Sequence, residues 1–390
     1  MRPAQLALSA ITLSAVAFAM STASSQDDNV CSMDRMEVAP RAVIEPCSTL
    51  LQHPDLSAEQ RGLALFVRGR GYHRSGRINL AQQDYDEAIK LIPANDELYV
   101  SRANISWRLN RYPEGHQFLA QALAINPKNA HALRMLGLNR ASNGQIDDAI
   151  DYLSRALEAD PTEAYALKFR SEFYLSRRQV DLAFKDADAL VAMPPEVINR
   201  QGYLARSGRM LDFHVVALQT RASLSEKVGR YELAEQDHNA AVAYQRSVLS
   251  LTGRAEFLQR RPAREKEALE NFDAALIIEP DNSHVLFDKA VLLTRLNRTP
   301  EALPLLDHAV AAAPENGRLF LMRAFVHRDL DQPDAATSDY VTAIALAPDI
   351  VPETVRRLRQ SGYWRSAEMP EEFTNEFRDA LQACMLDKRC

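Results

Sequence analysis

The sequence contains little glycine, 13 residues among 390. Soluble proteins average about 7% glycine, and dinucleotide-binding sheets, phosphate-binding loops and β-sandwiches use it at their tight turns. The scarcity therefore favours an all-helical protein. Positive charge is not in excess either, because 46 Lys and Arg residues stand against 52 Asp and Glu residues and the net charge is −6. Without a global basic field, we expect no nucleic-acid partner.

Long apolar runs are confined to the first 25 residues. Arg2 precedes a mostly apolar stretch over 6–20, small residues fill 21–25, and the chain then turns polar. This layout is typical of a secretory signal peptide over 1–25, cut after Ala23 or Ser25. The stretch is shorter than the roughly 20 residues of a bilayer span, and a retained membrane anchor is the alternative. We expect an exported protein, periplasmic in a bacterium, that does not insert into the membrane after cleavage.

Catalytic and metal-binding motifs are also missing. The sequence has no G-x-S-x-G, H-E-x-x-H, P-loop, C-x-x-C or EF-hand pattern. Its nine histidines are dispersed, and no two of them lie four residues apart beside a carboxylate. We therefore expect neither an enzyme nor a cofactor nor a metal site, with the histidines on the surface or in seams between helices.

A period of 34 residues runs through most of the chain. Four consecutive frames begin at Gly62, and four more begin at Val215. Seven of the eight frames carry alanine at position 20, seven carry alanine at position 27, and seven carry proline at position 32. Position 8 is small in seven frames, and position 24 is a larger apolar residue in six. An unrelated alanine-rich bundle would not hold this register over four units twice.

This pattern resembles the tetratricopeptide repeat family. The resemblance implies that each frame forms two amphipathic helices, helix A over positions 2–14 and helix B over positions 17–30, and that the frames stack into a right-handed all-α solenoid. The residue types fit this architecture. Small residues at positions 8, 20 and 27 let helices approach closely, the larger residue at 24 fills the seam, and proline at 32 ends helix B.

The register predicts the domain organisation. We expect an N-terminal cap over 26–61, a first array of four repeats over 62–197, an extra helix over 198–214, a second array of four repeats over 215–350, and capping helices over 351–390. The extra helix divides the solenoid into two arrays, either as a hinge or as a rigidly packed insertion. Glu256 replaces the small residue at position 8, and the preceding frame lacks its proline. We expect longer or more openly packed helices between 231 and 261.

Four cysteines flank the repeats, Cys31 and Cys47 at one end and Cys384 and Cys390 at the other. They allow three pairings. If the repeats form an extended solenoid, its ends lie far apart, and only Cys31–Cys47 and Cys384–Cys390 satisfy the roughly 4.4–6.8 Å between Cα atoms that a disulfide needs. We expect each pair to staple one end of the molecule.

The last 40 residues resemble the small helical peptidoglycan-binding domains of some exported bacterial proteins. The shared residues are Val355, Leu358, Gly362, Tyr363, Ala380, Leu381 and Cys384. The resemblance implies glycan binding, although the glycine-rich turn of those domains has no counterpart after Gly362. Capping of the solenoid is our first interpretation of this segment. A cell-envelope adaptor that binds peptidoglycan or another glycan is the alternative function.

Charge is segregated between the two helices of each frame. In the first four frames helix A carries ten basic and two acidic residues, and helix B carries three basic and eleven acidic residues; the last four frames repeat this bias. The family resemblance implies that helix A lines a concave groove. The candidate groove residues of the first array are Phe66, Arg70, His73, Arg74, Asn104, Trp107, Arg108, His131, Arg134, Tyr165 and Lys168.

Aromatic faces beside guanidinium groups suit an extended acidic peptide or a chain-end carboxylate. The sequence therefore predicts a non-catalytic, exported scaffold that binds a protein or peptide in a basic groove. In the alternative interpretation the opposite charges of helices A and B pair along the stack, where each exposed pair adds up to about 1 kcal/mol.

Overall fold

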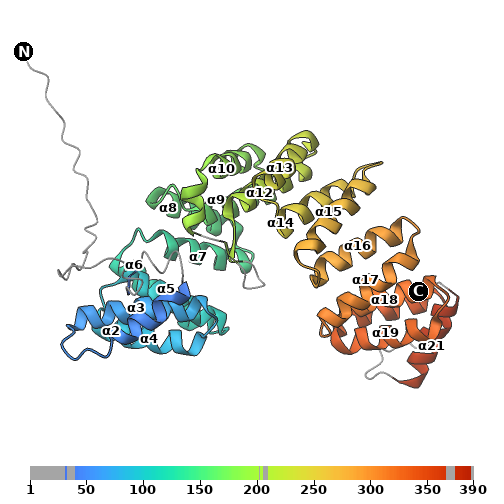
Figure 1. Cartoon of the computed structure of the whole chain (residues 1–390), viewed down its shortest axis with the longest axis horizontal. Coiled ribbons are helices and arrows are strands. Elements are labelled where there is room, and N and C mark those ends of the chain that lie inside the picture. Colours follow the sequence, from blue (N-terminus) through green and yellow to red (C-terminus); the bar gives the residue numbers. More distant parts are fainter. Residues whose placement is uncertain (1–30, 33–39, 202, 205–209, 366–373, 388–390) are drawn as a thin grey trace, which may run out of the picture. The chain divides into compact units, whose positions relative to one another are not determined.

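The computed structural model describes residues 31–32, 40–201, 203–204, 210–365 and 374–387. These residues are helical apart from turns and one pair of two-residue strands, so the predicted all-α repeat fold is confirmed (Figure 1). The chain divides into two compact units, residues 1–127 and residues 128–390. The predicted signal peptide lies outside the described residues. Within the described residues, no helix combines the length and the apolar character that crossing a bilayer requires.

The first unit contains two complete helical hairpins behind an N-terminal segment. Its elements are η1 (Pro40–Val43), α2 (Ile44–Leu50), α3 (Ala58–Arg74), α4 (Ile78–Leu91), α5 (Asp96–Arg108) and α6 (Tyr112–Ile125). Helix α3 pairs with α4, α5 pairs with α6, and α4 packs against α5. The N-terminal segment covers α3, because Val43 and Cys47 are fully buried against Val67.

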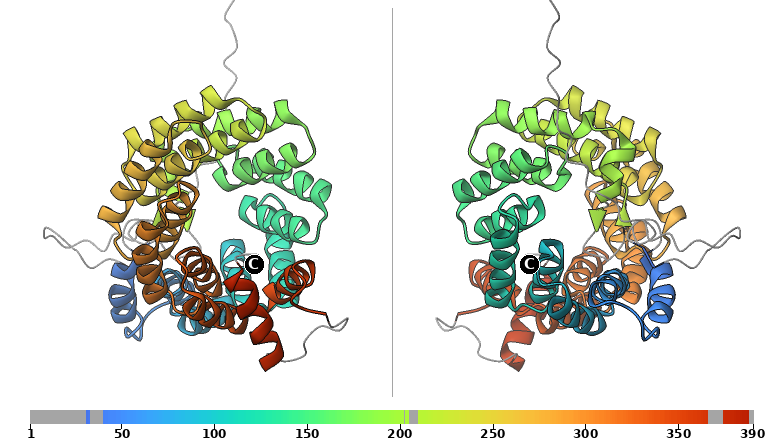
Figure 2. Two further views of the ribbon diagram at one scale, coloured as in Figure 1. Left: turned by 90° about the vertical axis from the view of Figure 1, so that its right-hand side faces the viewer. Right: turned by 90° about the vertical axis from the view of Figure 1, so that its left-hand side faces the viewer.

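The second unit continues the same construction through six further hairpins. Its elements are α7 (Ala130–Ser142), α8 (Ile146–Ala159), α9 (Ala164–Ser176), α10 (Val180–Ala192), α11 (Pro195–Gln201), β1 (Tyr203–Leu204), β2 (Met210–Leu211), α12 (Phe213–Lys227), α13 (Tyr231–Tyr244), α14 (Val248–Leu258), α15 (Glu265–Ile278), α16 (Ser283–Arg295), α17 (Thr299–Ala312), α18 (Gly317–Asp329), α19 (Pro333–Leu346), η2 (Pro348–Ile350), α20 (Val351–Gln360) and α21 (Asn375–Leu386). Each helix B of this unit packs against the next helix A, as Figure 2 shows for the consecutive hairpins.

Small residues bring the helices together as the period predicts. The seven alanines at position 20 are fully buried: Ala81, Ala149, Ala183, Ala234, Ala268, Ala302 and Ala336. At position 8 of the first repeat, a Cβ atom on Gly69 would lie 2.6 Å from the ring of Tyr85. The close approach of helices A and B therefore depends on the missing side chain at that position.

The turn between helices A and B has the same backbone conformation in all eight repeats. Position 15 is left-handed throughout, at Gly76, Asn110, Gly144, Arg178, Gly229, Ala263, Asn297 and Asp331. Glycine, asparagine and aspartate tolerate this region best. Arginine and alanine do not, so the fourth repeat (α9–α10) and the sixth (α14–α15) hold a strained residue at this turn.

The insertion over 198–214 differs from the single helix that the sequence predicts. Helix α11 ends at Gln201, and a strand pair follows in which Tyr203 faces Leu211 and Leu204 faces Met210. The boundary between the compact units lies after Pro127 rather than at this insertion. Asn199 accepts a hydrogen bond of 2.7 Å from the backbone N–H of Phe213, and α10 packs directly against α12. The insertion therefore interrupts the sequence register without separating the neighbouring hairpins.

The helices between 231 and 261 are not longer than their counterparts, so the longer-helix alternative of the prediction is wrong. Helix α13 has 14 residues, like most helices B, and α14 has 11 residues, fewer than any other helix A. Helix α13 ends where the backbone turns extended at Gln245. A capping box of Ser247 and Ser250, in which each side chain bonds the backbone N–H of the other, then fixes the start of α14.

The C-terminal helices complete the core of the last repeat. Phe377, Leu381 and Cys384 on α21 are buried in one cluster with Tyr340 of α19 and Leu358 of α20. Five residues that carry the resemblance to glycan-binding domains are buried in this cluster, namely Val355, Leu358, Ala380, Leu381 and Cys384. Their side chains pack against the repeat, as capping requires.

Candidate partner-binding surfaces

Helix A carries arginine or lysine at position 7 in six repeats: Arg68, Arg102, Arg170, Arg221, Lys289 and Arg323. In four of these repeats the guanidinium group donates two hydrogen bonds to an aspartate at position 23 of its own helix B. The pairs are Arg68–Asp84, Arg170–Asp186, Arg221–Asp237 and Arg323–Asp339, with distances of 2.7–2.9 Å. We call this arrangement the arginine bracket. It ties the two helices of a repeat together.

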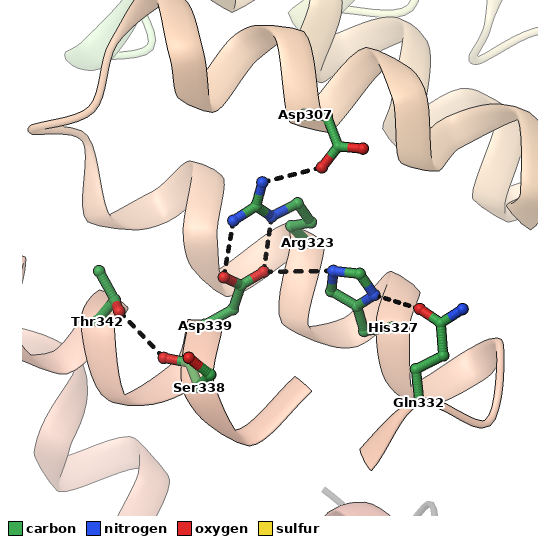
Figure 3. Close-up of polar contacts among 7 residues, drawn as sticks. All are labelled: Asp307, Arg323, His327, Gln332, Ser338, Asp339 and Thr342. Atoms are coloured by element: carbon green, nitrogen blue, oxygen red, sulfur yellow. Dashed lines mark hydrogen bonds and ion pairs between the residues drawn. The ribbon is translucent and has the colours of Figure 1, made fainter. Parts of the chain in front are cut away.

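In two of the four brackets, the arginine also donates a hydrogen bond to an aspartate of the preceding repeat. Arg323 Nη1 donates to Asp307 on α17 at 2.9 Å, in addition to its two bonds with Asp339 (Figure 3). Arg221 Nη1 donates in the same way to Asp188 on α10 at 2.8 Å, across the insertion. The three-way contact explains part of the charge segregation, because basic residues of helix A neutralise acidic residues of two helices B. At position 7 the pairing interpretation is therefore correct.

The first unit brings together four of the predicted groove residues. They are Arg70, His73 and Arg74 on α3 and Arg108 on α5. Burial lowers the pKa of His73 to about 4, and the positive charges of the three arginines lower it as well. The imidazole is therefore neutral at pH 7 and lies within a cluster of cations. Such a cluster favours an anionic group.

Two other predicted groove residues of the first unit pack between its helices, Phe66 buried and Trp107 half-buried. Phe66 is 4% exposed and packs 6.1 Å from the ring of Tyr85. Trp107 lies against α6, where a Cβ atom on Gly115 would be 2.3 Å from its ring. Its indole nitrogen is buried without a hydrogen-bond partner among the described residues. Both rings therefore fill the space between helices, while Asn104 is exposed.

In the second unit, Arg134 and Tyr165 form a stacked pair between α7 and α9. The guanidinium carbon of Arg134 lies 4.9 Å from the ring centroid of Tyr165. Its Nε donates to Glu163 Oε1 at 3.1 Å, and the other oxygen of Glu163, whose side chain is 1% exposed, caps the start of α9 through the N–H of Ala166. The terminal Nη atoms of Arg134 have no hydrogen-bond partner among the described residues. They are held in place and remain available to a carboxylate.

Helix α9 continues this pair as an aromatic row. Tyr165 and Phe169 stack with ring centroids 6.4 Å apart, and Phe173 follows 6.4 Å beyond Phe169. Lys168 Nζ lies 4.5 Å from the ring centroid of Phe169 and is ion-paired with Glu172 at 2.7 Å. All three rings are half-buried, and His131 is exposed on the preceding helix A. We call Arg134, Tyr165, Lys168, Phe169 and Phe173 the α9 surface.

The predicted groove residues do not include Phe169 and Phe173, although Tyr165, Phe169 and Phe173 follow one another at intervals of four residues, which predicts that their rings adjoin.

The sequence also gives no signal for a shallow pocket of about 340 Å³ beside α12, α13 and the end of α14. Glu226 in this pocket accepts a hydrogen bond of 2.8 Å from Arg260, and the Arg261 guanidinium lies 3.8 Å from the Tyr231 ring centroid. The hydrogen bonds from His238 and Arg260 lower the pKa of Glu226 despite its burial.

Three metal-ligating side chains meet at one place among the described residues. Glu256 on α14 and both His284 and Asp288 on α16 each present a ligand atom within 4.8 Å of the other two.

At the N-terminus, a disulfide joins Cys31 to Cys47, with Cα atoms 4.7 Å apart. Cys390, which the predicted second disulfide requires, lies outside the described residues.

Comparisons with known proteins agree with the repeat pattern. A family model described as tetratricopeptide repeat matches residues 108–173 and 264–324, and a second model of that description matches 66–130. The human antiviral innate immune response effector IFIT1 is 23% identical over 161 residues, 39% of this chain and 32% of that protein. The mouse DnaJ homolog subfamily C member 7 is 24% identical over 139 residues, 32% of this chain and 28% of that protein. The chain spans about a third of the length of these curated relatives.

Solved structures resemble the chain at low sequence identity. The Cut9–Hcn1 hetero-tetramer of APC/C matches with a TM-score of 0.48 and 12% identity, covering 89% of this chain and 59% of that one. The first such repeat domain of Spaghetti (RPAP3), solved bound to an HSP90 peptide, matches with a TM-score of 0.29 and 22% identity over 31% of this chain and 95% of that one.

Proposed function

This chain is a tetratricopeptide repeat protein, and we propose that it is an exported scaffold that binds an extended acidic peptide segment of a partner on the α9 surface. Repeats of this type indicate protein–protein interaction, and folds built from them are generally non-enzymatic. The observation that carries the proposal is the guanidinium of Arg134, oriented by Glu163 and Tyr165 beside a row of aromatic rings.

The α9 surface has the two properties that recognition of an acidic peptide requires. The Nη atoms of Arg134 present a planar pair of donors, which matches the two oxygens of a carboxylate. The half-buried rings of Phe169 and Phe173 supply apolar area for the neighbouring side chains of the peptide. The arginines of the four brackets cannot serve in the same way, because an aspartate of the same repeat already accepts two hydrogen bonds from each.

A random peptide library selected on the purified full chain tests the proposal. We expect the enriched peptides to be acidic with interspersed apolar residues. Their affinity, measured by fluorescence anisotropy, should fall at least tenfold in Arg134→Glu and severalfold in Phe169→Ala. Arg298→Glu is the matched control, because it makes the same charge change at an exposed site paired with Glu301. Equal affinity in wild type and Arg134→Glu would refute the assignment of the α9 surface.

The exported state of the protein is part of the same proposal. It is supported by the layout of residues 1–25 and by the pairing of Cys31 with Cys47, since disulfides persist in oxidising compartments. Expression in a Gram-negative host should yield a periplasmic form that begins after Ala23 or Ser25 and contains no free thiol, by N-terminal sequencing and mass spectrometry. An uncleaved cytoplasmic form with reduced cysteines would contradict it.

A further inference from the structure

We propose that Glu256, His284 and Asp288 form a binding site for a divalent transition-metal ion on the helix A side of the second unit. The inference is independent of the α9 surface. Glu256 lies at position 8 of its repeat, where seven repeats have a small residue, and its carboxylate points toward the following helix A. His284 and Asp288 are one helical turn apart on α16, so that their side chains lie on the same face.

The two carboxylates of this cluster are only partly balanced by positive charge, since burial and Asp288 raise the pKa of Glu256 more than His284, Arg260 and His238 lower it. Among the described residues, no arginine or lysine is ion-paired with Glu256 or Asp288, and the nearby Arg260 is bound to Glu226 instead. Asp288 Oδ2 is shielded from solvent without a hydrogen-bond partner and lies 3.6 Å from His284 Nδ1. Burial and the neighbouring Asp288 raise the pKa of Glu256, and burial raises that of Asp288. A bound cation would relieve both the repulsion and the unsatisfied oxygen.

The donor set indicates the class of ion. One imidazole nitrogen and two carboxylate oxygens suit Zn²⁺ or another first-row divalent ion, whereas Ca²⁺ and Mg²⁺ prefer oxygen ligands alone. Three protein ligands leave a coordination position for water or for a group of a partner. The ligand atoms are within 4.8 Å of each other and must approach to about 3.5 Å around a tetrahedral ion. The long Glu256 side chain and the His284 ring, 74% exposed, have room to make this adjustment.

Isothermal titration of the metal-depleted, non-reduced full chain with ZnCl₂ tests the site. We expect one ion per chain, an increase in the thermal unfolding temperature on binding, and weaker binding as pH falls because the ligands take up protons. His284→Ala, Glu256→Gln and Asp288→Asn should each weaken Zn²⁺ binding at least tenfold. Their unfolding temperatures in EDTA, compared with wild type in EDTA, show whether the fold is retained.

His308→Ala is the matched control. His308 lies 2.7 Å from Asp281, a histidine–aspartate contact that lacks the third ligand among the described residues. The His308→Ala variant should bind Zn²⁺ with the same affinity as wild type. The proposal fails if wild type shows neither heat nor stabilisation with ZnCl₂, if His284→Ala binds as tightly as His308→Ala, or if CaCl₂ is bound and ZnCl₂ is not. In the last case the imidazole is not a ligand.

Discussion

The repeats α18–α19 and α14–α15 have the same left-handed turn between helices A and B, but they differ in how their charged side chains are paired. In α18–α19, Arg323 is shared by Asp339 and Asp307, and His327 adds a contact of 3.6 Å to Asp339 (Figure 3). In α14–α15, alanine replaces this arginine at position 255 and asparagine replaces the aspartate at position 271. The carboxylates of Glu256 and Asp288 then gather without an arginine between them.

The difference shows that a repeat can lose the arginine bracket when other contacts hold its helices. Ala255 and Phe272 are fully buried in one apolar cluster with Leu258 and Ala268, and Asn271 donates to the backbone carbonyl of Glu267 instead of binding across the hairpin. Apolar packing thus replaces an ionic tie at this position. Charged side chains of one sign then lie together at two places, carboxylates at Glu256 and Asp288 and guanidinium groups around His73.

Removal of the bracket from α18–α19 should have the largest effect. Arg323→Leu leaves Asp339, whose side chain is 9% exposed, without its cation, and should lower the free energy of unfolding by about 3 kcal/mol. Lys289→Leu is the matched control, because its partner Asp273 is 56% exposed and the pair should contribute less than about 1 kcal/mol. If both variants lose the same free energy of unfolding, measured in urea, then burial of the aspartate does not determine how much the bracket stabilises the repeat.

Burial of His73, together with the arginines around it, should make the first unit sensitive to acid. The pKa of His73 is about 4 in the folded protein and about 6.5 in the unfolded chain, so only the unfolded state gains a proton as pH falls below 6.5. The free energy of unfolding should therefore drop by up to about 2 kcal/mol between pH 7 and pH 5 through this residue. His73→Gln should remove that part of the pH dependence. An unchanged slope in the variant would mean that His73 does not titrate as described.

A substitution in the left-handed turn of α14–α15 should stabilise the protein. Ala263 has φ of 61°, and Ala263→Gly should raise the free energy of unfolding by about 1 kcal/mol because alanine is strained there. Gly229→Ala at the same position of the preceding repeat, where φ is 78°, should lower it by a similar amount. Effects of the same sign in both variants would contradict the shared turn geometry.

The smallest change in stability should come from a substitution at the proposed metal site when no metal is bound. Glu256→Gln removes one of two neighbouring like charges and should raise the free energy of unfolding in EDTA at pH 7 by about 0.5 kcal/mol. The pKa values of Glu256 and Asp288 are raised on folding, so the wild type loses stability as pH rises through them and the variant should lose less. A variant that is less stable than wild type at pH 7 would show that the charge is compensated.

The sequence predicted the hairpins because their packing depends on residues at fixed spacing within 34 positions. Arg at position 7 and Asp at position 23 recur in register, so the arginine bracket is also predictable from the sequence, although the total charge of each helix does not reveal it. The position of Trp107 on helix A predicts a groove residue, and the missing Cβ of Gly115 leaves room for its ring to pack against α6, which helix position alone does not indicate. Glu256 meets His284 only across an intervening helix B, which no local pattern indicates.

Hydrogen exchange of the full chain with and without a library-selected acidic peptide tests the central claim most directly. If the α9 surface binds the peptide, amide protection should increase in α7 and α9, and the bracketed repeat α18–α19 should exchange as before. Protection confined to α20 and α21, or to the first unit, would contradict the account.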